Sequence, residues 1–314
     1  MSSEEQRQAN SFEGGGLKHV ILGAGAVGGL IGAALAHEGE QVTVLVRPES
    51  LARHPRHLCL ERLSCKIKPS IQLDTKLSGV VDVLWIAVKA HQLVAALLSV
   101  PPDGAGIATI VPLLNGIDHV ALLRSRFNHE RVVPGTISVE SERVALGRII
   151  QRSPFARLAL SAVGQQQLEG VAARLRHAGF SCEFQADEKT ILWSKLAFLA
   201  PFALTSTASD KDIQGIFADD AWRGRLESAV GEACAVAAAD RAAVDRQKIL
   251  ATLESLPATM RSSMQKDVSA GRIPELDAIG GPVTRVGRRH GLDVPTTREL
   301  VARIEDRLNK ELKQ

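Results

Sequence analysis

Cysteine, net charge and long apolar runs are all scarce in this 314-residue chain. The four cysteines are too few for a disulfide framework and show no CxxC spacing, so we expect neither disulfides nor a bound metal. Such cysteine usage is typical of a reducing, cytoplasmic compartment. The 38 Lys and Arg residues nearly balance the 35 Asp and Glu residues, and this net charge of +3 argues against a nucleic-acid partner.

No segment is apolar enough to predict a membrane span. A spanning helix needs about 20 apolar residues. The longest unbroken apolar run here, residues 196–204, is much shorter and contains Pro201. Residues 1–16 are polar, end in three glycines and lack the apolar core of a secretory signal, so we expect a flexible lead-in. The sequence therefore predicts a protein that neither crosses a membrane nor carries a secretory signal.

The first part of the chain alternates strand and helix signals. From Leu17 onward, strands are expected at residues 18–22, 41–46, 81–88, 107–114 and 131–139. The first two strands and the helix between them, at 25–38, form one βαβ unit, whose strands run parallel. The predicted fold class is therefore α/β, with helices on both faces of a sheet. We assign residues 17–184 to a Rossmann-like dinucleotide-binding domain.

The second part of the chain is predicted to be all-α. After about Cys182, β-branched runs become rare and Ala, Leu, Arg and Glu dominate. Helices are expected at residues 187–208, 220–242, 247–256, 258–270, 275–290 and 297–312. Pro201 and Pro282 fall inside two of these helices and should kink or break them. We assign residues 185–314 to a helical substrate and catalytic domain.

A glycine-rich turn joins the first strand to the first helix. Its sequence, GAGAVG, fits the GxGxxG pattern of dinucleotide-binding proteins. Gly23 permits the tight turn, Gly25 lets the backbone approach a pyrophosphate, and Gly28 lets the helix pack closely on the strand. The helix start at Ala26 and Val27 supplies unpaired N–H groups and a partial positive charge for phosphates. The alternative is an ordinary glycine-rich turn.

The residue that follows the second strand bears on the choice of dinucleotide. An NAD enzyme usually ends this strand with Asp or Glu, which accepts a hydrogen bond from the ribose 2′-hydroxyl. Here the strand ends LVRP, with Arg47 and no acid. Arg47 can pair with a 2′-phosphate through a charge-assisted contact, and Arg53 and Arg56 are close enough in sequence to help. We favour NADP (NADPH) over NAD; the alternative for Arg47 is a solvated surface arginine.

One lysine lies in a segment that is apolar almost all round. Ile191 and Leu199 sit one helical turn to either side of Lys195, so the helix is expected to be buried. Burial disfavours the charged form, lowers the pKa of Lys195 and makes it a better proton donor near neutral pH. The alternative is that the alkyl chain of Lys195 carries the ammonium out to the surface.

Polar residues follow two of the later strands. Lys89 comes just after the strand ending at Val88, and Asn115 follows the strand at 107–114. Ligands of open α/β sheets bind at these carboxyl ends. Asn115 is a candidate to hold a substrate carboxylate or the nicotinamide ribose, and Lys89 to supply positive charge for an anionic ligand. Taken singly, each can also be an ordinary loop residue, and His91 is better explained as a capping or surface histidine.

Together these features resemble the ketopantoate reductase (2-dehydropantoate 2-reductase) family, over nearly the whole chain from Leu17. The most specific similarity is RSSM, at 261–264, followed at the family's distance by ELD, at 275–277. The other matching segments, in order, are GAGAVGG, Arg47, VKAHQ at 88–92, LNG at 114–116, Lys195-Leu196 and residues 291–295. GxGxxG by itself is shared by many dehydrogenases.

The resemblance implies the NADPH-dependent reduction of a 2-oxo acid to a 2-hydroxy acid, most simply ketopantoate to pantoate. It implies that Lys195 protonates the ketone oxygen and that Ser263 and Glu275 hold the substrate, Glu275 also taking part in catalysis and facing the cofactor. It also implies that Lys89 and Asn115 contact the cofactor. Closure of the cleft between the domains would bring Lys195 to the nicotinamide and exclude water.

The sequence departs from the family pattern where amides usually face the substrate. The family usually carries Asn four and eight residues after the lysine, where this chain has Leu199 and Ala203. An Asn expected after the acidic motif is replaced by Gly280. Lost amide donors reduce orientation and specificity. An apolar Leu199 as a substrate contact suits a bulkier or less hydroxylated 2-oxo acid.

Two alternatives to ketopantoate reduction stay open. One is a reductase on this scaffold for another 2-oxo or 3-oxo acid, or one that forms an opine-like product. The other is a non-catalytic NADP-binding sensor, against which the pairing of Lys195 with Glu275 argues. Expected partners are a small-molecule substrate and, on base rates alone, a second copy in a homodimer. The family resemblance points to pantothenate biosynthesis.

Overall fold

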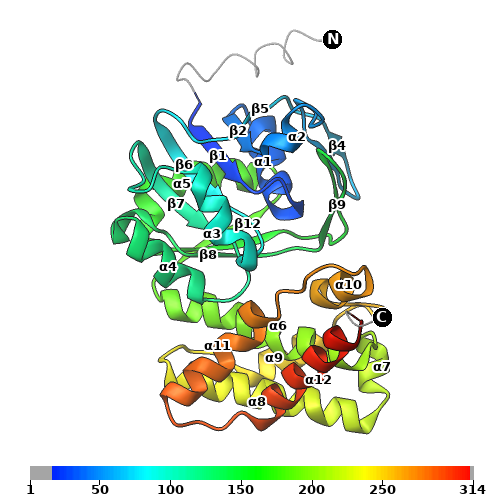
Figure 1. The fold of residues 1–314 in the computed structure, drawn as a ribbon. Coiled ribbons are helices and arrows are strands. Elements are labelled where there is room, and N and C mark those ends of the chain that lie inside the picture. Colours follow the sequence, from blue (N-terminus) through cyan, green and yellow to red (C-terminus); the bar gives the residue numbers. More distant parts are fainter. Residues whose placement is uncertain (1–15, 312–314) are drawn as a thin grey trace.

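The computed structural model describes residues 16–311 of the chain. The predicted lead-in lies outside the described residues except for Gly16, as do the last three residues of the predicted helical domain. Figure 1 shows a strand-containing part above and a group of helices below. The chain passes from one part to the other between β12 (Ser181–Gln185) and the long helix α6 (Glu188–Ser209).

A five-stranded sheet in the order β5-β2-β1-β6-β7 forms the centre of the upper part. Its strands are all parallel, as expected for βαβ units. They are β1 (Lys18–Leu22), β2 (Gln41–Leu45), β5 (Gln72–Asp74), β6 (Val81–Ile86) and β7 (Ile107–Pro112). The strand order reverses between β1 and β6, and such a switch point opens a crevice at the carboxyl ends of the strands.

Both faces of this sheet are buried because alternate residues of its strands face opposite sides. Ile21 and Trp85 contribute to one apolar cluster, together with Leu30 of α1 (Ala26–His37) and residues of α5 (Gln165–His177). Leu22 and Leu84 contribute to the cluster on the other side, under α3 (Leu93–Ala96) and α4 (Asp118–Arg126). The sheet therefore has helices on both faces, as predicted. A further short helix, α2 (Pro48–Leu51), follows β2.

Two smaller sheets complete the upper part and correct one expectation. The predicted strand at 131–139 is β8 (Gly135–Ser138), which pairs antiparallel with β11 (Arg157–Ser161) in the sheet β12-β11-β8. It is therefore not a sixth strand of the central sheet. The other sheet has the order β4-β3-β10-β9. Its strands are β3 (Cys59–Glu61), β4 (Lys66–Ile67), β9 (Ser141–Ala145) and β10 (Arg148–Gln151).

The lower part consists of helices packed around α6. They are α7 (Ile213–Phe217), α8 (Asp220–Ala239), α9 (Arg246–Glu254), α10 (Ser263–Ser269), α11 (Leu276–Arg289) and α12 (Pro295–Glu311). By length and composition alone α6 is apolar enough to span a bilayer, but 72% of its most apolar window is buried inside the protein. Such burial is typical of the core helix of a soluble domain.

Two details of these helices differ from the sequence expectation. The helix expected from residue 258 begins only at Ser263, because the carbonyls of Ala258 and Met260 accept hydrogen bonds from Gln214 and Ile213 of α7. The helix α7 itself was not predicted. In addition, α6 and α11 continue through Pro201 and Pro282, so neither proline breaks its helix.

The proline in α11 affects how the two parts meet. Pro282 has no N–H to donate to the carbonyl of Ala278, four residues earlier in the helix. Gly116, in the loop after β7, lies against this carbonyl: a Cβ at position 116 would lie 2.3 Å from the Ala278 oxygen. Gly116 also has a φ of +84°, which favours glycine. The backbones of the upper and lower parts thus meet here without a side chain between them.

Candidate active site

The glycine-rich turn has the geometry of a phosphate-binding loop. Gly23 has a φ of +116°, and a Cβ there would lie 2.8 Å from the carbonyl of Ala87 at the end of β6. A Cβ on Gly28 would lie 2.0 Å from the carbonyl oxygen of Gly23. A Cβ on Gly25 would meet only one atom, the Ala87 oxygen at 3.9 Å. The protein packs tightly at two of the three glycines and leaves open space at the third, which fits a dinucleotide pyrophosphate.

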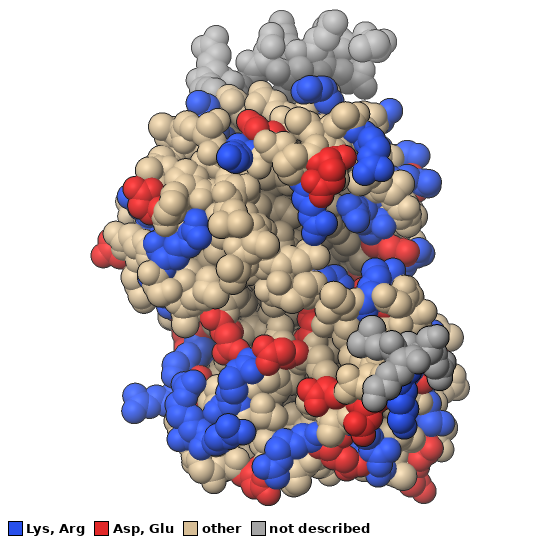
Figure 2. Space-filling view, viewed as in Figure 1, with Lys and Arg blue, Asp and Glu red and all other residues tan. Residues whose placement is uncertain are grey.

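Two arginines lie near this turn. Arg47 is exposed just beyond the carboxyl end of β2, where it precedes the first residue of α2. Arg143 of β9 donates a 3.3 Å hydrogen bond from Nη1 to the carbonyl of Ala24, inside the turn. Figure 2 shows lysine and arginine side chains gathered over this flank of the upper part. This charge suits an anionic cofactor.

Lys195 lies near the middle of α6 and is half-buried. Burial lowers the pKa of its ammonium from 10.5 to about 8, while the carboxylate of Glu275 acts in the opposite direction. Among residues 16–311, no hydrogen bond or salt bridge engages the Lys195 ammonium. Of the two alternatives for this lysine, the structure therefore supports partial burial near Glu275 rather than extension to the surface.

Glu275 joins the lower part to two strand ends of the upper part. It lies at the N terminus of α11, and its Oε1 accepts a 2.9 Å hydrogen bond from the backbone N–H of Ala90. Its Oε2 accepts a 3.0 Å hydrogen bond from Nδ2 of Asn115. Since Ala90 follows β6 and Asn115 follows β7, one carboxylate holds the loops after two neighbouring strands.

Lys89 makes a second connection across the same boundary. Its ammonium pairs with Asp267 of α10, whose other oxygen accepts a 2.9 Å hydrogen bond from Nε of Arg272. Nearby, Lys266 pairs with Glu140 at 2.8 Å. The sequence motif included Asp267, but residue reasoning alone gave it no role. His91, by contrast, is exposed.

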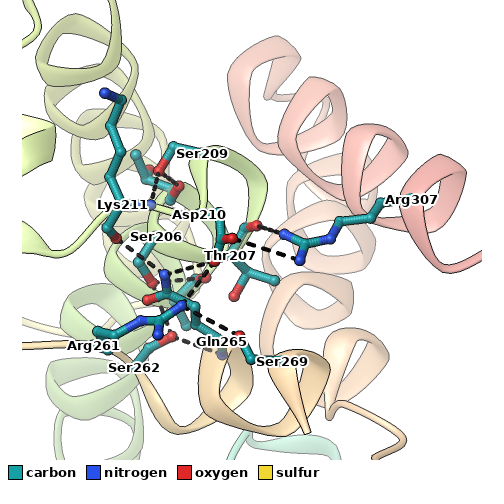
Figure 3. Close-up of polar contacts among 12 residues, drawn as sticks. Ser206, Thr207, Ser209, Asp210, Lys211, Arg261, Ser262, Gln265, Ser269 and Arg307 are labelled. Atoms are coloured by element: carbon teal, nitrogen blue, oxygen red, sulfur yellow. Dashed lines mark hydrogen bonds and ion pairs between the residues drawn. The ribbon is translucent and has the colours of Figure 1, made fainter. Parts of the chain in front are cut away.

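The start of α10 is anchored to the end of α6, as Figure 3 shows. The hydroxyl of Ser206 donates to Oγ of Ser262 at 2.8 Å, and Ser262 Oγ accepts the N–H of Gln265 at 3.1 Å. Nη2 of Arg261 donates to Asp210 at 2.8 Å. Ser263, the predicted substrate contact, is the exposed first residue of this anchored helix. It is therefore presented from a fixed position.

The three positions that lack the family's amides differ in their surroundings. Leu199 is half-buried one turn beyond Lys195, whereas Ala203 is fully buried in the helical core. A Cβ on Gly280 would lie 2.8 Å from Cγ2 of Val301 in α12. An asparagine at position 280 would therefore require Val301 to shift, and of the three positions only Leu199 is partly exposed.

One further polar residue near the site escaped the sequence reasoning. His119, in the first turn of α4, is only 6% exposed, and neither of its ring nitrogens has a hydrogen-bond partner. Burial and the charge of Lys195 lower its pKa to about 3. Its position four residues after Asn115 was the one signal in the sequence that associated it with a strand end.

The structure thus brings most of the predicted site residues to one edge of the central sheet. The glycine-rich turn follows β1, Arg47 follows β2, Lys89 follows β6 and Asn115 follows β7. Lys195 and Glu275 face this edge from the helical part. A half-buried ammonium with a pKa of about 8, near Glu275 at this sheet edge, can donate a proton to a substrate bound there.

Comparisons with known proteins identify the family of this chain. The family model "Ketopantoate reductase PanE/ApbA" matches residues 19–164, and the corresponding C-terminal model matches residues 187–307. An uncharacterized oxidoreductase, YkpB of Bacillus subtilis, is 28% identical, covering 92% of this chain and 98% of its own. A 2-dehydropantoate 2-reductase of Caulobacter vibrioides is also 28% identical, covering 90% of this chain and 96% of its own.

Solved structures share the fold along almost the whole chain. A ketopantoate reductase from Ralstonia eutropha superimposes with a TM-score of 0.84 at 24% identity, covering 94% of this chain and 100% of its own. A D-mandelate dehydrogenase with NADH and anilino(oxo)acetate has a TM-score of 0.82 at 20% identity, covering 94% and 99%. A dimeric ketopantoate reductase from Staphylococcus aureus has a TM-score of 0.77 at 18% identity, covering 94% and 100%. At these identities the likeness concerns the fold.

Proposed function

Since the chain belongs to the ketopantoate reductase family and is an oxidoreductase, we propose that it reduces the keto group of a 2-oxo acid with NADPH. The observation that carries the proposal is the half-buried ammonium of Lys195, which faces Glu275 at the carboxyl edge of a dinucleotide-binding sheet. The predicted domains divide this work: residues 17–184 hold the cofactor and residues 185–314 supply the proton donor.

The chemistry needs a hydride and a proton on opposite ends of one carbonyl bond. A nicotinamide dinucleotide, when bound, supplies the hydride. Lys195 donates the proton to the ketone oxygen and stabilises the negative charge that develops there. With a pKa of about 8, Lys195 is largely protonated at neutral pH yet gives up its proton more readily than an exposed lysine. Glu275 keeps the ammonium charged and orients the site.

NADPH is the proposed cofactor rather than NADH. The tip of β2 carries Arg47 and no acid, so a ribose 2′-hydroxyl has no carboxylate acceptor there, whereas a 2′-phosphate has a cation. The residues proposed to hold the cofactor span the sheet edge: Gly23, Gly25, Ala26, Val27, Gly28, Arg47, Lys89, Asn115 and Glu275. Asn115 and Glu275 already contact each other across the cleft, which supports a role where the cofactor meets the substrate.

The first candidate substrate is 2-dehydropantoate, the substrate named for relatives that cover nearly the whole chain. Asn115, Lys195, Leu199 and Ser263 would contact it. A second candidate is a bulkier, aromatic 2-oxo acid. Leu199 favours it, because a half-buried leucine one turn from Lys195 offers an apolar surface where the family usually has an amide. The fold-related D-mandelate dehydrogenase, bound to anilino(oxo)acetate, supports this second candidate.

The test is the loss of NADPH absorbance with 2-dehydropantoate and with phenylglyoxylate, in the parent and in Leu199→Asn and Leu199→Met. If 2-dehydropantoate is the substrate, the parent reduces it efficiently and Leu199→Asn improves or preserves kcat/KM. If the aromatic acid is the substrate, Leu199→Asn loses about tenfold in kcat/KM for it while Leu199→Met stays near the parent. NADPH binding with no turnover of any 2-oxo acid would contradict the proposal and favour a sensor.

We further propose that the protein acts as a cytoplasmic homodimer in pantothenate biosynthesis. The dimeric relative of the same fold supports the homodimer. Sedimentation of the purified protein measures its mass directly, and a monomer at working concentration would contradict this part of the proposal.

A further inference from the structure

His119 is a buried polar group for which the reduction described above has no use. It belongs to α4 in the upper part, is 6% exposed and has no partner at either ring nitrogen. A buried imidazole without hydrogen bonds costs free energy, because its polar atoms have lost water and gained nothing in return. In native proteins such groups are uncommon and point to a function or to a missing partner.

The charged group that acts on His119 is the ammonium of Lys195. The positive charge of Lys195 acts on the imidazole of His119 from α6, and the carboxylate of Glu275 acts on Lys195 from the start of α11. Among residues 16–311 the Lys195 ammonium also makes no hydrogen bond. Two partnerless polar side chains therefore lie within electrostatic reach of each other, one with three N–H donors and the other with a lone pair.

The imidazole can serve Lys195 only as an acceptor. A histidine kept neutral by burial and by a neighbouring cation carries one N–H and one free lone pair. It cannot supply the reaction proton, because it is not protonated in the range where enzymes work. Direct contact with substrate is also disfavoured, since both ring nitrogens are buried away from solvent.

We propose that His119 is a positioning residue for Lys195: its neutral ring nitrogen accepts a hydrogen bond from the ammonium and aims another N–H at the substrate ketone. The bond requires a rotation of the flexible lysine side chain, since neither ring nitrogen of His119 has a hydrogen-bond partner in the structure. The inference rests on the proposed role of Lys195 as proton donor. The proposed bond gives Lys195 a polar neighbour on α4, whereas the residue one turn further along α6, Leu199, offers none.

The matched variants are His119→Gln and His119→Met. Both side chains are unbranched and similar in helix propensity and size, but only glutamine offers a strong acceptor. We expect His119→Met to lower kcat about tenfold with little change in KM or in NADPH affinity, and His119→Gln to recover most of the loss. Thermal unfolding of both variants shows whether they fold equally well.

A second readout requires no turnover. The Cε signal of Lys195 is titrated by NMR in the full-length protein with isotope-labelled lysine, and it is assigned by its loss in Lys195→Arg. An acceptor stabilises the ammonium, so His119→Met should lower the pKa of Lys195 by about one unit relative to His119→Gln.

Equal pKa values in the two variants would overturn the inference, as would a KM increase with unchanged kcat, which would make His119 a substrate contact. If the parent reduces no 2-oxo acid, the proposed function fails, while the titration still decides whether His119 contacts Lys195.

Discussion

Oε2 of Glu275 accepts a 3.0 Å hydrogen bond from Nδ2 of Asn115, a residue that lies 160 positions earlier in the chain. The other carboxylate oxygen binds the N–H of Ala90. A single acidic side chain of the helical part thereby holds the loops after β6 and β7. The closed arrangement of the two parts is thus built from groups that also belong to the candidate site.

Removal of this carboxylate should loosen the closure. Glu275→Ala loses two hydrogen bonds to a charged acceptor, so we expect kcat/KM to fall about 100-fold and the unliganded protein to expand. Small-angle X-ray scattering measures the expansion as an increase in the radius of gyration. Glu275→Gln keeps one acceptor oxygen and should fall between the parent and the alanine variant. An unchanged radius in Glu275→Ala would show that other contacts hold the two parts together.

Catalysis should depend on pH through Lys195. Its folded-state pKa is about 8, and the ammonium must be protonated to donate a proton. We therefore expect kcat to be constant below about pH 7 and to fall as the pH rises through about 8. Steady-state assays at saturating NADPH test this. A profile that is flat to about pH 10 would indicate a different proton donor.

Replacement of the lysine should separate activity from stability. Lys195→Met should lower kcat by at least about 100-fold while the Kd for NADPH stays within about twofold of the parent. The same change should raise the free energy of unfolding at pH 7 by about 1–3 kcal/mol, because a partly buried cation is removed. In the parent the folded pKa lies below the unfolded 10.5, so stability rises with pH between about 8 and 10.5. Urea unfolding at pH 7 and above pH 10.5 measures both effects.

An added methyl group should affect folding at one glycine of the turn and cofactor binding at another. A Cβ on Gly28 would lie 2.0 Å from a backbone oxygen, so Gly28→Ala should destabilise the fold by about 1–3 kcal/mol or more. Gly25 faces open space, so Gly25→Ala should leave the Tm nearly unchanged and weaken NADPH binding at least about tenfold. Thermal unfolding and fluorescence titration distinguish the two. Equal NADPH affinity in Gly25→Ala and the parent would place the pyrophosphate elsewhere.

Cofactor preference should depend on Arg47. Loss of a charge-assisted contact with the 2′-phosphate should weaken NADPH binding by about 10- to 100-fold in Arg47→Ala, with little effect on NADH. Arg47→Lys keeps the charge, so its NADPH affinity should fall between those of the parent and Arg47→Ala. Dissociation constants for both cofactors, measured at two salt concentrations, provide the check. A similar loss for NADPH and NADH would exclude the 2′-phosphate assignment.

The sequence predicts best where the constraints are local. The close contact between Gly28 and the Gly23 carbonyl lies within the turn itself, so the local pattern was sufficient to place the turn. The pairing of Glu275 with Asn115 depends on how two distant segments pack, and the sequence around either residue does not indicate its partner. The strand β8 had ordinary β-branched signals, but sheet membership depends on its pairing with β11, which those signals do not encode. His119 was not singled out from the sequence, because burial is a tertiary property.

The contact between Gly116 and the Ala278 carbonyl has a consequence for protein engineering. The carbonyl receives no hydrogen bond from position 282 because Pro282 has no N–H, and it fits against the loop because position 116 has no side chain. These three positions therefore form one unit that extends over both parts of the chain. A chimaera that takes its upper part from a relative must keep glycine at position 116, because a side chain there would collide with the Ala278 carbonyl of this α11.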